Sequence, residues 1–398
     1  MTPEIKQRIE QIRRGEVPEG YKKGKLGVVP EEWEETSFSS LFTSTSDYTD
    51  DLEKYPLYSL TIEDGVTPKT ERYERSHLVK KEDSYKIVRP NDYAYNPMNL
   101  RFGSVARHKG NSPVAVSGYY DIFTTVHKSD LPFMDSFLTC DPMITYYNRV
   151  STGSLVEKQR VHFSQFLEFV LPLPSINERA KIAAILTTQD KVIELKEKRL
   201  AEKQRQKKYL MQQLLTGKKR LPGFSKEWKS VRLRNTLNVC HGQNQRNVEQ
   251  ENGVYPILGT GGEIGRTNDF LYDKPCILIG RKGSINKPMY METPFWTIDT
   301  LFYCKIKSGY HPKFLFFKFQ SINWNKYDES SGVPRLNAST IGSVDIFAPE
   351  FPEQTAIAEV LSAADREIDL LRQDIEQEKQ KKKALMQLLF TGIARVKT

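Results

Sequence analysis

The sequence has no long apolar run, and its N-terminus is not typical of a targeting signal. None of its apolar stretches reaches the roughly 18 residues that a membrane-spanning helix needs. The first residues, MTPEIKQRIEQIRRGE, lack the apolar segment of a secretory signal peptide. We therefore expect a soluble cytoplasmic protein.

Cysteine is scarce and scattered. The four cysteines, Cys140, Cys240, Cys276 and Cys304, contain no CxxC pair. This spacing argues against a zinc site and against a disulfide framework. We expect free thiols that are buried in the fold, and no bound metal.

Motifs for nucleotide or methyl-transfer chemistry are also missing. Residues 259–265, GTGGEIG, are followed by RTNDFLYDKP, which offers no helix N-terminus to a pyrophosphate, so we predict a turn between strands. Residues 279–284, IGRKGS, do not have the residue order of a P-loop. Residues 95–98, YNPM, lack the second proline and the aromatic residue of the Asn-Pro-Pro-aromatic loop of amino-methyltransferases. We therefore predict that the chain is not an enzyme.

What the sequence does have is an excess of positive charge and enough apolar residues for more than one core. The formal net charge is +9, which favours a polyanionic partner such as DNA. A hydrophobic content of 38% over 398 residues indicates a folded chain with two domains.

A similar sequence motif occurs twice in the chain, as KKYLMQQLLTG at residues 207–217 and as KKKALMQLLFTG at residues 381–392. From Pro174 to Gly217 the first copy matches the second, from Pro349 to Gly392, at a constant offset of 175 positions. Upstream the offset grows to 180 for Arg101 against Arg281, and to 195 for Trp33 against Trp228. The chain is therefore an internal repeat whose loops differ in length.

The repeated segment has the composition and period of a coiled-coil helix. The first copy contains no proline or glycine between Pro174 and Gly217, and in both copies apolar residues recur at alternating steps of four and three. Copies of equal length favour antiparallel pairing within the chain over an external dimerisation helix, and we predict that Gly217 and Gly392 end the two helices. The predicted seam and partner-interface residues are Ile182, Leu186, Ile193, Leu200, Leu210, Leu214, Ile357, Leu361, Ile368, Leu371, Ile375, Leu385 and Leu389.

We predict an α+β fold with two globular domains separated by two long helices, which form an antiparallel intramolecular coiled coil with a pseudo-twofold repeat. Short β-like runs bounded by Gly, Pro or Asp, such as residues 276–279, 301–304 and 344–347, are typical of strands. The predicted parts are an N-terminal helical or connecting segment (1–29), a first domain (30–173), a first long helix (174–218), a second domain (219–348) and a second long helix (349–398).

Both globular halves contain loops rich in Arg, Lys, Asn and Gln. Asn and Gln can pair bidentately with adenine, and Arg with guanine. Paired clusters of such residues in a basic chain favour DNA over a merely solvated loop. The candidate DNA contacts are Lys69, Arg72, Arg75, Asn96, Arg101 and Arg107 in the first half, and Gln243, Asn244, Gln245, Arg246, Arg266, Arg281, Lys282 and Arg335 in the second.

Several of these motifs resemble the specificity subunit of type I restriction-modification systems. They are the repeated helix with its Leu-Met-Gln ending, residues 95–104 (YNPMNLRFGS) with residues 116–123, and residues 255–265, 277–284 and 334–337. In one departure, Gly118 and Tyr119 stand where the family usually shows Pro-Ala. The likeness covers nearly the whole chain.

The resemblance implies that each globular half is a target recognition domain that reads one half of a bipartite DNA target. The helices would set the spacing and dock two modification (methyltransferase) subunits, through which restriction subunits could join. S-adenosylmethionine, ATP and Mg²⁺ would then bind only to partner subunits, and none to this chain. A stand-alone, two-lobed DNA-binding regulator or architectural protein is the alternative that the residues leave open.

Overall fold

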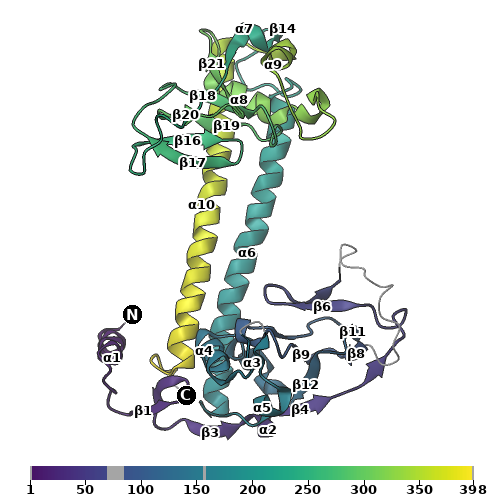
Figure 1. The fold of residues 1–398 in the computed structure, drawn as a ribbon, viewed down its shortest axis with the longest axis vertical. Coiled ribbons are helices and arrows are strands. Elements are labelled where there is room, and N and C mark those ends of the chain that lie inside the picture. The colour runs from purple at the N-terminus through teal and green to yellow at the C-terminus, as the bar shows by residue number, and fades with distance from the viewer. Residues whose placement is uncertain (1, 70–84, 156–157, 397–398) are drawn as a thin grey trace. The chain divides into compact units, whose positions relative to one another are not determined.

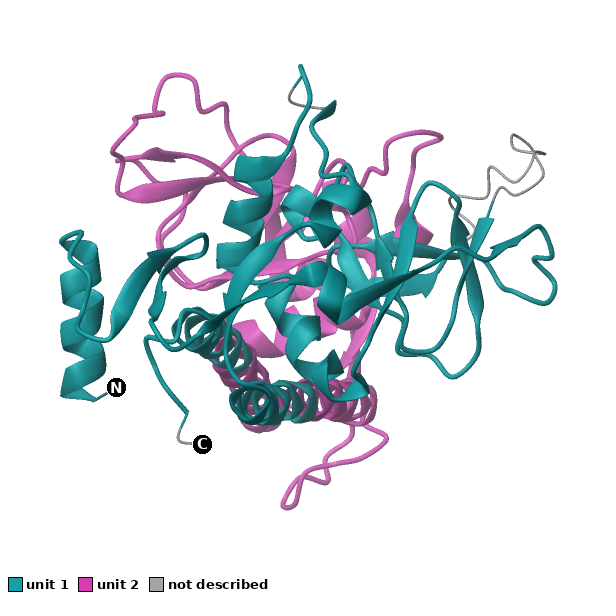
Figure 2. Ribbon diagram, turned by 90° about the horizontal axis from the view of Figure 1, so that it is seen from below, with its two compact units in different colours: residues 1–195, 375–398 teal, residues 196–374 magenta. Residues whose placement is uncertain are grey.

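The computed structural model describes residues 2–69, 85–155 and 158–396. The chain divides into two compact units: unit 1 comprises residues 1–195 and 375–398, and unit 2 comprises residues 196–374 (Figure 2). Both units mix helices and strands, as the sequence predicted, and each contains part of the two long helices, α6 (Ile176–Leu214) and α10 (Phe351–Phe390).

Unit 1 is built from short strands and short helices that precede α6 (Figure 1). Its strands are β1 (Tyr21–Gly24), β2 (Gly27–Pro30), β3 (Glu34–Ser37), β4 (Phe42–Thr45), β5 (Tyr48–Thr49), β6 (Tyr58–Thr61), β7 (Gly65–Pro68), β8 (Tyr85–Val88), β9 (Tyr93–Tyr95), β10 (Val105–Arg107), β11 (Val114–Ser117), β12 (Asp121–Thr125) and β13 (Val170–Leu173). Its helices before α6 are α1 (Pro3–Arg13), α2 (Phe38–Leu41), η2 (Leu100–Phe102), η3 (Lys128–Asp130), α3 (Leu131–Phe137), α4 (Asp141–Val150) and α5 (Phe163–Leu167).

The larger sheets of unit 1 have the strand orders β10-β9-β12-β4 and β11-β8-β5, and the remaining pairs are β1-β2, β3-β13 and β6-β7. All the paired strands of unit 1 are antiparallel. Aromatic rings fill the space beside them. Phe123 of β12 stacks on Tyr93 of β9, with 5.1 Å between ring centroids, and Phe166 of α5 packs against both Phe38 and Tyr95.

Unit 2 contains a four-stranded sheet of order β15-β21-β18-β19, a three-stranded sheet of order β17-β16-β20, and the pair β14-β22. Its strands are β14 (Lys229–Arg232), β15 (Leu237–Cys240), β16 (Tyr255–Gly259), β17 (Gly262–Thr267), β18 (Cys276–Gly280), β19 (Met289–Met291), β20 (Trp296–Thr297), β21 (Leu301–Ile306) and β22 (Asp345–Ala348). Its short helices are α7 (Leu233–Thr236), α8 (Pro312–Ser321), η5 (Trp324–Tyr327) and α9 (Ala338–Ser343). The glycine-rich segment 259–265 contains the turn between β16 and β17, as predicted: it runs from the last residue of β16 through residues 260–261 into β17.

The internal repeat is visible in the element order. In unit 1, β3, α2 and β4 follow one another and β3 pairs with β13, the strand before α6. In unit 2, β14, α7 and β15 follow in the same way and β14 pairs with β22, the strand before α10. The two units thus share this order of elements and this strand pairing, and they differ in their loops.

Each core takes in the start of one long helix and the end of the other. In unit 1, Ile182 and Leu186 of α6 and Leu389 and Phe390 of α10 join the aromatic cluster. In unit 2, the equivalent residues Ile357, Leu361, Leu214 and Leu215 join the core of that unit. Burial of such side chains stabilises the junctions by roughly 1.5 to 3 kcal/mol each.

Within each unit, α6 and α10 lie side by side and antiparallel (Figure 1). In unit 2, Lys196 pairs with Asp374 at 2.8 Å, whereas Lys203, further along α6, pairs with Glu367 at 2.9 Å, which lies earlier on α10. In unit 1, Gln189 donates to Glu378 at 2.6 Å. The polar residues that interrupt the apolar seam therefore bond across it.

Most of the predicted seam residues are buried in the unit to which they belong. Leu200, Leu210 and Leu385 are only partly buried. The buried ones are Ile182, Leu186, Ile193, Leu214, Ile357, Leu361, Ile368, Leu371, Ile375 and Leu389.

An ion-pair network connects the end of one long helix to the start of the other. In unit 1, Arg395 donates to both oxygens of the buried Glu178 at 2.8 and 2.9 Å, and Trp33 Nε1 donates to the same carboxylate at 3.3 Å. Unit 2 repeats this arrangement: Arg220 donates to both oxygens of Glu353 at 2.6 Å each, and Trp228 Nε1 donates to the same carboxylate at 3.2 Å. Gly217 and Gly392 lie just before the two arginines in the left-handed conformation, with φ of 71° and 67°, as expected of glycines that end helices.

Candidate nucleic-acid interface

Four segments of unit 2 converge into one surface, which we call the unit 2 loop cluster: residues 241–247, 281–284, 297–300 and 334–337. Gln243 N–H donates to the Thr297 carbonyl at 2.8 Å, and Arg281 N–H donates to the Thr300 carbonyl at 2.8 Å. Residues 281–284 and 334–337 are joined by Gly283 N–H to the Pro334 carbonyl, also at 2.8 Å. Backbone hydrogen bonds therefore fix loops that are far apart in the sequence.

Two glycines allow this close approach. A Cβ on Gly242 would lie 2.0 Å from the Ile298 carbonyl oxygen, so no larger residue fits there without a shift of backbone. Gly283 has a φ of 83°, in the left-handed region that favours glycine. The glycines thus place the neighbouring polar side chains on a single surface.

The predicted side chains of this cluster are largely exposed. Gln243, Asn244, Arg246, Lys282 and Arg335 are exposed, whereas Gln245 and Arg281 are half-buried. The Asn244 side chain accepts from Arg246 N–H at 2.9 Å, which orders the loop tip. The cluster therefore combines amide and guanidinium donors without an apolar cover.

Asp328 anchors the segment that carries Arg335. The backbone N–H groups of Arg335 and Ser330 and the Ser330 hydroxyl donate to one Asp328 oxygen, and these hydrogen bonds hold the pKa of its carboxyl below the usual range. The Arg335 backbone is held in this way, while its side chain faces solvent.

Arg266 is a different case among the predicted residues of unit 2. It lies on β17, where its guanidinium pairs with Glu263 at 3.0 Å and donates to the Val254 carbonyl at 3.3 Å. These contacts belong to the β16–β17 hairpin, and not to the loop cluster.

Unit 1 contains a loop with the same local geometry. Gly103 has a φ of 93°, close to that of Gly283, and both glycine carbonyls accept from the N–H two residues later at 2.8 Å. Arg101 beside it is half-buried and donates to Gln159 at 2.9 Å, with its guanidinium over the Phe102 ring. Lys69 is exposed after β7, and Arg72 and Arg75 lie outside the described residues.

Two predicted DNA contacts of unit 1 have internal roles instead. Arg107 donates to both oxygens of Asp135 at 2.9 and 2.7 Å, and to Asn91 at 2.6 Å. Asn96 is buried, and its side chain accepts from Met98 N–H at 3.1 Å, within its own turn. Their polar groups are engaged within the fold, which makes both residues weaker candidates for DNA contact than the exposed residues.

One candidate was missed in the sequence. Arg160 occupies the position in unit 1 that Arg335 occupies in unit 2, at the same offset of 175 residues as the helices. It is half-buried, and its backbone pairs with Thr152, whereas Arg335 pairs with Lys282 of the neighbouring loop. Applying the repeat offset to the loops as well as to the helices would have found it.

Across the described part of the chain, no group of three or more His, Cys, Asp or Glu side chains could hold a metal ion. The four cysteines are free; Cys140, Cys276 and Cys304 are buried, as predicted, whereas Cys240 is partly exposed. Burial raises the pKa of Cys140 and Cys276 to about 12, which suppresses the reactive thiolate. Of the helices that the structure describes, none is long and apolar enough to cross a membrane.

Comparison with known proteins points in one direction. Residues 225–380 match the model of the type I restriction modification DNA specificity domain. The chain is 26% identical to the type I restriction enzyme MjaX specificity subunit of Methanocaldococcus jannaschii, over 96% of this chain and 98% of the relative. It is also 26% identical to the MjaVIII specificity subunit of the same organism, over 58% of this chain and 64% of that protein.

Solved structures share the fold. The S subunit of a type I restriction-modification system from M. genitalium superposes with a TM-score of 0.58 at 16% identity, covering 90% of this chain and 96% of that one. A chain from a study of complex assembly and conformational transition of the type I R-M system gives a TM-score of 0.59 at 15% identity, covering 92% and 99%.

The matched domain is a DNA specificity domain and not a catalytic one, which confirms the prediction that the chain is not an enzyme. The domain match, the nearly full-length relative and the shared fold agree with the resemblance seen in the motifs. Residues 225–380 are thus similar to the type I restriction modification DNA specificity domain, and nearly the whole chain is similar to a specificity subunit of a type I restriction enzyme.

Proposed function

We propose that this chain is the specificity subunit of a type I restriction-modification system and reads a bipartite DNA target, with unit 1 contacting one half-site and unit 2 the other. In this proposal α6 and α10 set the distance between the half-sites and hold two modification subunits. The methyl donor S-adenosylmethionine, and ATP and Mg²⁺ for any restriction step, bind to those partners and not to this chain.

The observation that carries the proposal is the duplication of a complete design. Each unit has the same strand pairing before its long helix, the same Arg–Glu–Trp network and the same glycine-bearing loop. The connecting helices are almost equal, with 39 residues in α6 and 40 in α10. A protein that reads two half-sites at a fixed spacing needs two reading domains and one spacer, and two similar units with two long helices fit that requirement.

The unit 2 loop cluster has the chemistry of base-edge readout. Gln243, Asn244 and Gln245 can pair with the edge of adenine, and Arg246 or Arg335 with that of guanine, while Lys282 suits a phosphate. In unit 1 the corresponding candidates are Lys69, Arg101 and Arg160. The different side chains in the two loops support different half-site sequences.

The test is to map methylated bases made by the complex reconstituted with its modification subunit. Arg246→Ala or Arg335→Ala should relax the bases accepted in one half-site and leave the other half-site unchanged, with a loss of about 1 to 3 kcal/mol for a bidentate contact. Arg232→Ala is a matched control, because Arg232 forms only an exposed pair with Asp345 outside the cluster.

Two outcomes would contradict the proposal. Relaxation of both half-sites by one substitution would mean that the units do not read separately. Sequence-specific DNA binding by the chain at physiological salt, with no affinity for any modification subunit, would favour a stand-alone regulator.

A further inference from the structure

One exposed apolar side chain and one exposed lysine lie on paired loops of unit 2. Lys282 precedes Gly283, whose N–H donates to the Pro334 carbonyl at 2.8 Å, and Val333 precedes that proline. Val333 is 69% exposed, and Lys282 is exposed as well. The hydrogen bond therefore holds the loop with the apolar side chain against the loop with the cation.

Unit 1 has the same two residue types at the equivalent positions, but exchanged between the loops. Phe102 corresponds to Lys282 at an offset of 180 positions, and Lys158 corresponds to Val333 at an offset of 175. Phe102 is 52% exposed, and Lys158 is also exposed. The first loop thus carries an aromatic residue in unit 1 and a lysine in unit 2, and the second loop carries a lysine in unit 1 and a valine in unit 2.

The backbone and the neighbours of Phe102 are ordered although its ring is exposed. Its N–H donates to the Asn99 carbonyl at 2.9 Å, and the neighbouring Leu100 is fully buried. The Arg101 guanidinium lies 4.5 Å from the centre of the Phe102 ring and donates to Gln159 of the second loop at 2.9 Å. A side chain that is held in this way loses little conformational freedom when it contacts a partner.

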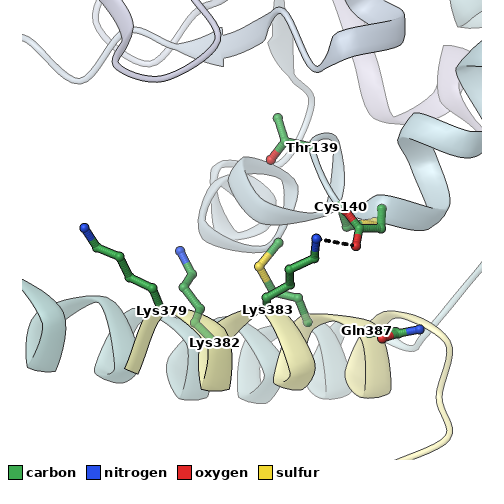
Figure 3. A pocket seen from close by; sticks show the side chains of 8 residues that line it. Thr139, Cys140, Lys379, Lys382, Lys383 and Gln387 are labelled. Atoms are coloured by element: carbon green, nitrogen blue, oxygen red, sulfur yellow. Dashed lines mark ion pairs between the residues drawn. The ribbon is translucent and has the colours of Figure 1, made fainter. Parts of the chain in front are cut away.

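The two lysines differ from a lysine whose charge is already paired. In the α10 pocket that Figure 3 shows, Lys383 forms an ion pair with Asp141 at 3.3 Å. Lys158 and Lys282 form no ion pair with any residue that the structure describes. Their ammonium groups can therefore bind an anion from outside the chain, such as a DNA phosphate.

The exchange of residue types between the loops is the observation that calls for a function. A single exposed apolar residue is ordinary on a protein surface. Here, however, both units keep one apolar and one cationic side chain on loops that the backbone joins. Duplex DNA offers a matching pair of groups, because the C5 methyl group of thymine lies in the major groove, which phosphates border.

We propose that Phe102 in unit 1 and Val333 in unit 2 each contact the C5 methyl group of a thymine in the half-site of their unit. Lys158 and Lys282 bind a phosphate beside that thymine. This inference rests on the proposed function, because that function supplies the half-sites. It adds two residues that select a base, and it names the base: each half-site contains a thymine whose methyl group touches the protein.

The experiment uses the full chain in complex with its modification subunit, and DNA duplexes that carry the target found by methylation mapping. Each thymine of the two half-sites is replaced in turn by deoxyuridine, which removes only the methyl group. At one thymine of each half-site this replacement should weaken binding by about fourfold, the effect of losing one buried methyl group.

Substitutions of the apolar residues test which side chain senses the methyl group. With Phe102→Ser, thymine and deoxyuridine should bind equally well in the unit 1 half-site, whereas the effect in the other half-site should remain about fourfold. Val333→Ser should give the converse result. Phe347→Ala is the matched control, because Phe347 is a 58% exposed aromatic residue on β22, outside these loops, and both deoxyuridine effects should persist.

Substitutions of the lysines give a second, independent readout. Lys158→Gln and Lys282→Gln should each weaken binding to all duplexes alike and lower the slope of log affinity against log salt concentration by about one. Lys226→Gln is the control, since Lys226 is exposed outside the loops and pairs with Glu350 at 2.8 Å. The slope for this control should not change.

The possible results are distinct. A deoxyuridine effect in each half-site that disappears only with the substitution in the matching unit supports the inference. A half-site without thymine overturns it, as does equal binding of thymine and deoxyuridine by the unaltered complex, or a deoxyuridine effect that persists in Phe102→Ser and Val333→Ser. If the unaltered complex methylates no bipartite target, the proposed function itself fails.

Discussion

The buried Lys318 of α8 should make the free energy of unfolding depend on pH, which can be tested. Its side chain is only 7% exposed, and its ammonium group donates to the Leu215 carbonyl at the end of α6. The Trp228 and Phe314 rings lie 5.1 and 5.7 Å from the ammonium nitrogen. Burial lowers the pKa of this group from 10.5 to about 8, because the charged form has lost its hydration.

The sign and size of the effect follow from proton linkage. Between about pH 8 and pH 10.5 the unfolded chain keeps the Lys318 proton while the folded chain loses it, so the free energy of unfolding rises with pH in this window. A difference of about 2.5 pKa units corresponds to about 3 kcal/mol. Below about pH 8 both states are protonated, and this gain in stability is absent.

The assay compares the unaltered chain with Lys318→Met and Lys318→Arg by denaturant unfolding at several pH values. Other groups titrate in the same range, so the difference between proteins is the quantity to follow. The unaltered chain should gain about 3 kcal/mol relative to both variants as the pH rises from 8 to 10.5, whereas the two variants should differ from each other by a constant amount. A difference that stays constant between the unaltered chain and Lys318→Met would refute this reasoning.

Two further predictions concern the junctions and the helix pair. Glu178→Ala leaves Arg395 and Trp33 without their acceptor and should lower the free energy of unfolding of unit 1 by about 2 to 3 kcal/mol, less than for a fully buried pair because Arg395 is 31% exposed. Glu178→Gln should lower this free energy by a smaller amount. Equal thermal stability of Glu178→Ala and the unaltered chain would contradict the role of the network. Ile368→Asp buries a charge in the seam, and Leu371→Pro breaks α10 at a cost of roughly 3 kcal/mol or more. In both variants, hydrogen exchange should show that the amides of α6 and α10 lose protection before those in the strands of either unit. Simultaneous loss of protection throughout the chain would count against separate cores.

The sequence predicted the long helices well because their signals are local. Heptad spacing, the absence of proline after the first turn and the glycines at positions 217 and 392 all act within a few residues of one another. The strand pairings could not be predicted from the sequence, because β3 pairs with β13 across more than 100 residues and the sequence of neither strand specifies its partner. Even so, the internal repeat, whose offset grows only from 175 to 195 positions, indicated that the two halves are copies of one unit.

The candidate site was harder to predict, because residue type alone does not reveal the partners of a side chain. Arg107 and Asn96 had the composition expected of DNA contacts, but Asp135 and the local turn engage them. Residues 281–284 and 334–337 were each noted in the sequence, yet only the backbone bonds between them reveal one surface. Internal comparison of the two copies is the signal that would have added Arg160.

The most direct measurement of the central claim is methylation mapping with a lengthened helix pair. Inserting one heptad after Leu200 in α6 and one after Leu371 in α10 keeps both seams in register and adds roughly 10 Å. The account predicts unchanged bases in both half-sites and a gap between them that grows by about three base pairs. Altered half-site bases, or an unchanged gap at full methylation activity, would contradict the claim that the helices set the spacing.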